Sequence, residues 1–281
     1  MMLVFTQFLV WLNQGANACA SILLAPLAVL PGWLSTTLVA AVTGVLMLGT
    51  FKLTSNQRAV KRVRNEIKAN LLALSLFRDN VLVGLQLQGR VLRGAGRLFT
   101  LALVPMLVMM LPTCLLLGQL AAWYQARPLR VGEEAVVTLS LAGGPGEDLP
   151  EVQLAPCAAF AVSVGPVRVT QPRMICWSLL ADQAGYHQLI FEMGGQTFTK
   201  ELAIGDGFMR VSPLRPAWRW LDVVRYPCET PFGADSVIQG IELAYPERRS
   251  WTAGSSSWLG YWLVASMAFA WLMRPLMKVH L

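Results

Sequence analysis

The stretch from Thr54 to Tyr124 constrains this chain more than any other part of the sequence. A basic segment with apolar residues at spacings of three and four runs directly into a long apolar segment, residues 98–124. A helix needs roughly 20 predominantly apolar residues to cross a bilayer, and the apolar segment meets that requirement. The stretch therefore predicts an integral membrane protein with a basic helical region on one side of the bilayer.

The composition fits a chain that is only partly embedded. The 281 residues are 55% hydrophobic and 14% charged, which is too apolar for one soluble domain and too interrupted for a pure helical bundle. We expect three spanning helices, at residues 34–53, 98–124 and 258–274. Each has Trp or Tyr near an end, where these side chains suit the headgroup level.

The charge is divided unevenly along the chain. Residues 51–97 contain ten Lys and Arg against two acids, whereas residues 127–249 contain eleven against fourteen. Cytoplasmic loops of membrane proteins carry an excess of Lys and Arg, so residues 54–97 and the tail 275–281 should be cytoplasmic. The N-terminus and the region after the second span should face outward. Because the excess charge flanks spans, it does not indicate DNA binding.

Residues 1–33 are apolar but interrupted by Asn13, Gln14 and Asn17. They carry no basic n-region, which disfavours a cleaved signal peptide. We expect one or two helices lying in the outer membrane interface, turned by Pro26 and Pro31-Gly32. Whether this region crosses the membrane is left open by its sequence.

Residues 54–97 are expected to form an antiparallel helical hairpin. Thr54-Ser55-Asn56 offers N-capping groups, an apolar stripe runs from Val60 to Phe77, and Arg78-Asp79-Asn80 marks a turn. The basic side chains expected to contact lipid headgroups, a client protein or a ribosome are those of Arg58, Lys61, Arg62, Arg64, Lys68, Arg90 and Arg93. The alternative is a solvated loop whose charge only fixes the topology.

Residues 61–124 resemble the YidC/Oxa/Alb insertase superfamily, including its relatives in the endoplasmic reticulum membrane complex. The family has a span, a basic cytoplasmic hairpin, and a second span that opens with a proline-containing run. Here that run is Leu103-Val104-Pro105-Met106-Leu107, continuing to Leu111-Pro112, and Arg78-Asp79-Asn80 occupies the position of a Lys-Asp-Asp-like turn. The resemblance implies a divergent three-span protein that assists insertion or folding of membrane proteins.

Bacterial members of that family usually carry an intramembrane arginine, whereas the first span here has no charge before Lys52. A milder polar path could be formed by hydroxyl and amide groups, namely Thr36, Thr37, Thr43, Thr50, Thr113 and Gln119. The alternative is that these hydroxyls bond only to the backbone of their own helix, as hydroxyls in membrane helices commonly do.

Residues 127–206 should form an extracytoplasmic β-sandwich. Short stretches with strand patterning begin at Ala135, and Gly194-Gly195 indicates a hairpin turn between two of them. The segment 182–186, ending at Tyr186, resembles the tyrosine corner of immunoglobulin-like domains. Cys157 and Cys176 could form a disulfide in an oxidising compartment, although free buried cysteines are an equal alternative. Residues 207–257 should form an amphipathic interfacial segment and a last strand.

Catalytic chemistry is not expected. The two histidines, His187 and His280, fall on opposite predicted sides of the membrane, and no residues have metal-ligand spacing. Gly143-Gly144-Pro145-Gly146 lacks a following Lys-Ser or Lys-Thr, which argues against phosphate binding of the P-loop type. We therefore expect no enzyme, no cofactor and no metal.

Two functions are compatible with these features. The first is an insertase-like protein of the bacterial cytoplasmic (inner) membrane, with lipids, nascent client proteins and possibly the ribosome as partners. The second is an envelope scaffold or assembly subunit that binds another subunit of a membrane complex through its β domain.

Overall fold

The computed structural model describes residues 2–24, 26–76, 81–144, 147–250, 257–277 and 279. The expected turn at Arg78-Asp79-Asn80, together with Phe77 and His280, lies outside these residues, as do Pro145-Gly146 of the glycine-rich loop. The chain forms two compact units, described separately below. The first comprises Met1–Thr36 and Cys114–Tyr261, and the second comprises Thr37–Thr113 and Trp262–Leu281.

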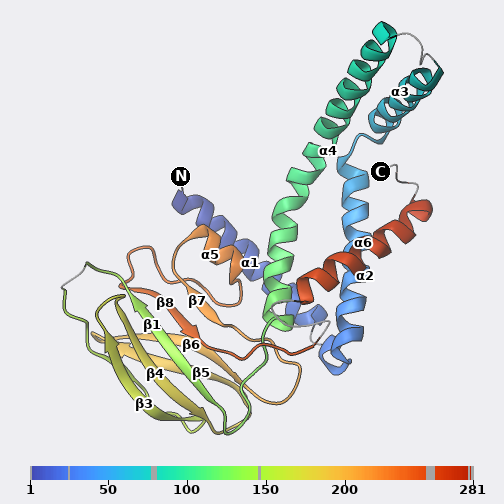
Figure 1. Ribbon diagram of the computed structural model, residues 1–281. Helices are drawn as coiled ribbons and strands as arrows, with labels where there is room; N and C mark the ends of the chain where they lie inside the picture. Colours follow the sequence, from blue (N-terminus) through green and yellow to red (C-terminus); the bar gives the residue numbers. More distant parts are fainter. Residues whose placement is uncertain are drawn as a thin grey trace. The chain divides into compact units, whose positions relative to one another are not determined.

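The helices are shown in Figure 1 with their labels. Their bounds are α1 (Met2–Leu24), the 3-10 helix η1 (Pro26–Val29), α2 (Gly32–Thr54), α3 (Gln57–Leu76), α4 (Val81–Tyr124), α5 (Trp220–Arg225) and α6 (Trp258–Met277).

Two helices of the described chain, α2 and α4, are long and apolar enough to cross a membrane, by length and composition. The third expected span, residues 258–274, forms helix α6, but α6 does not meet the same criterion. Its 20 residues include Arg274 and Pro275 beside several Trp and Tyr side chains, which lower its mean hydropathy. The prediction of three spans is therefore supported for two.

Helix α4 continues without a break through the expected boundary at residues 97–98. It contains 44 residues, with Pro105 and Pro112 inside it. A proline lacks the backbone N–H that would bond to the residue four positions earlier, so each removes one hydrogen bond without ending the helix. The second arm of the hairpin and the expected second span are thus one rod.

Helices α3 and α4 pack as an antiparallel hairpin in the second unit. The side chain of Ile67 comes within 2.7 Å of where a Cβ on Gly94 would lie, and Leu74 comes within 4.0 Å of that position at Gly84. Val60, Val63 and Leu87 are buried. Asn56 Oδ1 accepts a hydrogen bond from the Ala59 N–H at 3.1 Å, as the predicted N-cap requires.

Helices α2 and α6 also meet in the second unit through a close backbone approach. A Cβ on Gly44 would lie close enough to clash with the carbonyl oxygen of Ser266. Trp262 Nε1 donates to Thr43 Oγ1 at 3.1 Å. Glycine at position 44 is therefore required by the packing of these two helices.

The first unit contains two antiparallel sheets. Their strands are β1 (Glu134–Leu141), β2 (Val152–Leu154), β3 (Phe160–Val169), β4 (Met174–Ala181), β5 (Gly185–Met193), β6 (Gln196–Ile204), β7 (Leu214–Pro216) and β8 (Ile238–Leu243). One sheet has the order β3-β4-β1-β8-β7 and the other has the order β2-β5-β6. β1 is central, pairing with β4 from Glu134–Leu180 to Ser140–Met174 and with β8 on its other side.

The two sheets share one hydrophobic core. On β1, Val137, Leu139 and Leu141 point inward and are buried, as alternation along a half-buried strand predicts. Trp177 of β4 meets Phe191 of β5, with ring centroids 5.3 Å apart. The side chains of the two sheets therefore interdigitate between them.

The five-stranded sheet includes two strands that follow residue 206. β8 is the last strand expected within residues 207–257, whereas the short strand β7 was not expected. The hairpin turn at Gly194-Gly195 is confirmed, because β5 and β6 pair up to Met193–Gln196 and both glycines have positive φ.

The tyrosine-corner interpretation of Tyr186 was wrong. Its side chain is 57% exposed, and its hydroxyl accepts a hydrogen bond from the Arg210 N–H, 24 residues further along the chain. A tyrosine corner requires a bond to backbone a few residues upstream. The interpretation rested on the five residues 182–186 alone. The hydrogen-bond partner of the Tyr186 hydroxyl, Arg210, lies in the segment that follows β6.

A buried ion pair fixes that following segment to the sheet. Lys200 of β6 is fully buried and pairs with Glu229, and its ammonium also donates to the carbonyl oxygen of Ser212 at 2.5 Å. The second carboxylate oxygen of Glu229 accepts the Glu201 N–H at 3.1 Å. Separating the two partners would leave a buried charge uncompensated, which is strongly destabilising. The ion pair therefore holds residues 210–230 against the sheet.

The close approach of α2 and α6 yields a first prediction. Gly44→Ala should lower the free energy of unfolding by about 1–3 kcal/mol, because the new methyl group meets a backbone carbonyl that cannot rotate away. Thermal unfolding of the purified full-length protein in detergent measures the loss. The matched control is Gly49→Ala on the same helix, where a Cβ would make an ordinary 3.5 Å contact with Met277. Equal stability of the two variants would refute the packing described here.

Candidate functional site

The hairpin carries an exposed basic surface. Its cations are the seven predicted residues, which lie on α3 (Arg58, Lys61, Arg62, Arg64 and Lys68) and on α4 (Arg90 and Arg93). Six are exposed and Arg64 is half-buried. Among the residues that the structure describes, none of the seven forms an ion pair, and Glu66 is the only acid on α3. The surface is therefore free to attract an anionic partner.

An exposed apolar face follows on the same helix. Its large side chains are Phe99, Leu103, Val104, Met106, Leu107, Val108, Met110 and Leu111, each at least 36% exposed. In the most apolar window of α4 only 11% of the residues are buried. Contiguous apolar surface of this extent marks contact with lipid or with another protein. Its methionines are flexible and polarisable, and so can adapt to varied partners.

Three hydroxyl groups of the predicted polar path donate to the backbone of their own helix. Thr36 donates to the Gly32 carbonyl, Thr43 to that of Ala40 and Thr50 to that of Leu46. These bonds within α2 match the alternative reading of the hydroxyls, in which the helix backbone satisfies them.

The remaining path residues are Thr37, Thr113 and Gln119. Thr37 and Thr113 are half-buried, and Gln119 is buried with no hydrogen bond to its side-chain amide from a described residue. The sequence reasoning missed the hydrogen bond that is formed near the start of α2, where Ser35 Oγ lies 2.6 Å from Tyr124 Oη. A shared path for these side chains stays a prediction.

The disulfide between Cys157 and Cys176 is not formed in the structure, where all five cysteines are free. Cys157 is exposed beside the start of β3, whereas Cys176 lies in β4 opposite Thr138 and Val167. Cys228 is buried, and its burial raises the pKa of the thiol to about 11. A thiol with a raised pKa is a weak nucleophile at neutral pH.

Helix α1 docks on α5 and the loop after it. Asn13 Nδ2 donates to the Val223 carbonyl at 2.6 Å, and Asn17 Nδ2 donates to the Cys228 carbonyl at 2.9 Å. Arg210 Nη1 donates to Asn17 Oδ1 at 3.0 Å. Two of the three polar residues that interrupt the apolar N-terminal run, Asn13 and Asn17, are therefore docking contacts of the helix, which its sequence did not reveal.

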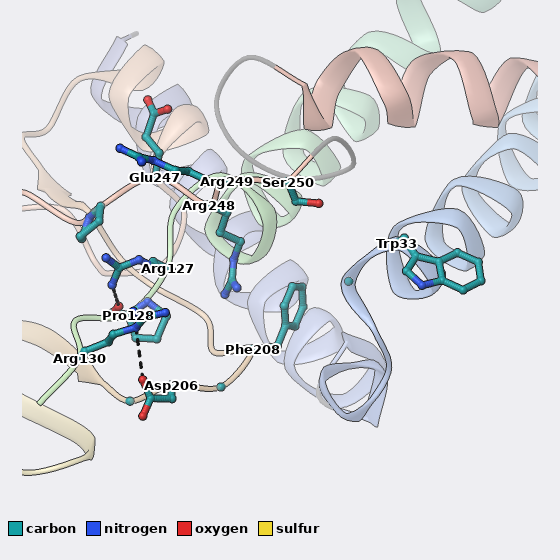
Figure 2. A pocket seen from close by; sticks show the side chains of 14 residues that line it. Trp33, Arg127, Pro128, Arg130, Asp206, Phe208, Glu247, Arg248, Arg249 and Ser250 are labelled. Atoms are coloured by element: carbon teal, nitrogen blue, oxygen red, sulfur yellow. Dashed lines mark hydrogen bonds and ion pairs between the residues drawn. The ribbon is translucent and has the colours of Figure 1, made fainter.

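A cavity of about 1000 Å³ lies in the first unit, where α2 begins and the chain leaves α4. Figure 2 shows Arg248 reaching into it beside Phe208, while Arg249 and Glu247 point away. The cavity lining contains four arginines, Arg127, Arg130, Arg248 and Arg249, but only two carboxylates, those of Asp206 and Glu247. No local sequence pattern singles out Arg248 or Arg249.

Comparison with protein-family models, with curated proteins and with solved structures finds no match for this chain.

The docking of α1 yields a second prediction. Asn13→Ala combined with Asn17→Ala should release α1, because the loss of these bonds leaves buried carbonyls unpaired at a cost of about 1–3 kcal/mol each. Hydrogen–deuterium exchange of the full-length protein should then show faster exchange in residues 2–24. Gln14→Ala, an exposed neighbour on the same helix, should leave exchange unchanged. Unaltered protection in the double variant would show that these bonds do not hold the helix.

Proposed function

We propose that the protein is a membrane-embedded, insertase-like factor that assists insertion or folding of other membrane proteins without catalytic chemistry. In this proposal α2, α4 and α6 span the bacterial cytoplasmic membrane, with the N-terminus outside and the C-terminus inside. The hairpin is cytoplasmic, and the two sheets form an extracytoplasmic immunoglobulin-like sandwich.

The continuity of α4 carries this proposal. One rod passes from a basic, exposed half bearing Arg90 and Arg93 into an exposed, methionine-bearing apolar half. Water would solvate the first half but not the second, so the boundary near residue 98 fits the cytoplasmic surface of a bilayer. A client captured by the basic half would lie next to an apolar face that continues into the membrane.

The charge of each region supports the orientation. The hairpin has a large excess of Lys and Arg, whereas residues 127–249 have an excess of acids. The positive-inside tendency therefore favours a cytoplasmic hairpin and an external sheet region.

The apolar surface of α1 and α5 fits an outer membrane interface. Phe5 and Trp220 meet edge to face, with ring centroids 6.4 Å apart. Further exposed apolar side chains on the two helices are Leu3, Val4, Phe8, Trp11 and Leu221. Such a face buries apolar area in the boundary between headgroups and acyl chains. This agrees with the interfacial placement expected for residues 1–33.

The proposed mechanism is passive. The hairpin cations attract an anionic surface, such as ribosomal RNA, lipid headgroups or an acidic client segment. The methionine-bearing face of α4 then accepts a hydrophobic client helix, since unbranched thioether side chains adapt to different shapes.

A third prediction tests this function by photo-crosslinking in native membranes. Crosslinkers placed at Leu72, which is 71% exposed, and at Met106, which is 66% exposed, should form adducts with nascent membrane proteins. Combined reversal of Arg58, Lys61 and Arg62 to Glu should lower the adduct yield at least about fivefold, since each basic residue near an anionic surface contributes about 1 kcal/mol.

The controls separate client contact from general surface exposure. A crosslinker at Val162 on β3 should give no nascent-chain adduct, and Arg168→Glu on the same exposed strand should leave the yield at Met106 unchanged. Adducts that are absent at both test positions, or insensitive to the triple reversal, would refute the insertase proposal.

An edge strand favours a second candidate function, that of an envelope scaffold or assembly subunit. β3 is the outer strand of its sheet, and Val162, Val164 and Val167 are exposed on it. An exposed apolar edge can pair with a strand of another protein. If the crosslinks to clients are absent while a single partner copurifies in gentle detergent and is lost on Val164→Lys, the scaffold function is favoured.

A further inference from the structure

The cavity at the start of α2 contains a guanidinium whose charge no carboxylate of the described residues neutralises. Arg248 Nε donates to the Trp123 carbonyl at 3.0 Å, and Nη2 donates to the Met209 carbonyl at 3.3 Å. Its guanidinium carbon lies 4.4 Å from the centroid of the Phe208 ring. Among the described residues, Arg248 forms no ion pair.

The surroundings leave this charge only partly compensated. Burial lowers the pKa of Arg248 to about 10, and the nearby charge of Arg127 acts in the same direction. The backbone carbonyls and the ring face stabilise the cation, but they carry no full negative charge. Binding of an anion beside this half-buried guanidinium would therefore stabilise its positive charge.

The neighbouring arginines differ in how closely a carboxylate pairs with each of them. Arg127 makes a two-pronged contact with Glu133, at 2.7 and 2.8 Å, which holds it in place. Among the described residues, the Arg130 side chain has one ion pair, with Asp206 at 3.4 Å, and both side chains are mostly exposed. An exposed pair contributes little stability, so Arg130 can turn toward an anion at small cost.

The cavity also lies at the level expected for lipid headgroups. Gly32 and Trp33, the first residues of α2, line it, and the first turn of that helix carries no acid. Helix N-termini favour anions, and the exposed indole of Trp33 suits the membrane interface. The end of α4 is adjacent, through the carbonyl oxygen of Trp123 that Arg248 contacts.

We propose that this cavity binds the phosphate of an anionic phospholipid, with Arg248 as the principal contact and Arg130 as a second. The guanidinium fork suits phosphate oxygens because it can donate two parallel hydrogen bonds. The proposal rests on the membrane placement proposed above, but not on client insertion. The bound headgroup would anchor the sheet region to the outer leaflet.

Lipid retention by the intact protein tests this site. The full-length protein, purified in a neutral detergent, is titrated with phosphatidylglycerol or phosphatidylcholine and examined by native mass spectrometry. The wild type should retain phosphatidylglycerol preferentially. Arg248→Gln should reduce this preference about fivefold, as expected for one basic residue at an anionic surface, and Arg130→Gln should reduce it in the same direction.

The controls distinguish the site from general charge and from misfolding. Arg219→Gln removes an arginine whose side chain is 72% exposed and which does not line the cavity, and it should leave the preference unchanged. Arg130→Gln keeps the test valid if Arg248→Gln does not fold, because Arg130 is an exposed side chain.

Two outcomes would overturn the proposal. One is retention of phosphatidylglycerol that is equal in the wild type and in folded Arg130→Gln and Arg248→Gln proteins. The other is full displacement of the lipid by submillimolar inorganic phosphate, which would identify a free phosphate site. If client crosslinks are absent while the preference for phosphatidylglycerol is intact, the insertase function alone is refuted. If client crosslinks form while that preference is absent, the lipid site alone is refuted.

Discussion

The need to cover the apolar face of α4 is the constraint on which the other features depend. This helix exposes large side chains from Phe99 to Leu111, and in water each would forfeit the free energy of burial, roughly 1.5–3 kcal/mol per residue. A bilayer removes that penalty. The basic residues before this face and the Trp123-Tyr124 pair at the end of the helix then mark where the apolar layer would begin and end.

The sequence predicted the features that are encoded locally. The apolar stripe and the Asn56 cap predicted α3, and Gly194-Gly195 predicted the β5–β6 turn, because helix periodicity and positive φ are properties of neighbouring residues. The continuity of α4 was not predicted, since a change from basic to apolar residues was taken as a boundary between helices. A change of solvent along a helix does not require a break in its hydrogen bonds.

Contacts between distant residues were beyond the sequence. Asn13 and Asn17 interrupt an apolar run, yet they bond to carbonyls more than 200 residues away. Lys200 lies on an alternating strand, but its partner Glu229 is on a separate segment. Arg248 lies in no recognisable sequence motif, and its role depends on its contact with the end of α4. In each case the role of the side chain depends on a partner that lies far away in the sequence and is brought close only by the fold.

The central claim is that the hairpin and the sheets lie on opposite sides of a membrane. Single cysteines at Gln86 on α4 and at Thr197 in the β5–β6 hairpin, both exposed positions, can be introduced after the five native cysteines are replaced. A membrane-impermeant maleimide applied to intact cells should label the cysteine at 197 and should reach the cysteine at 86 only after the membrane is opened. Equal labelling of both positions in intact cells would contradict the account.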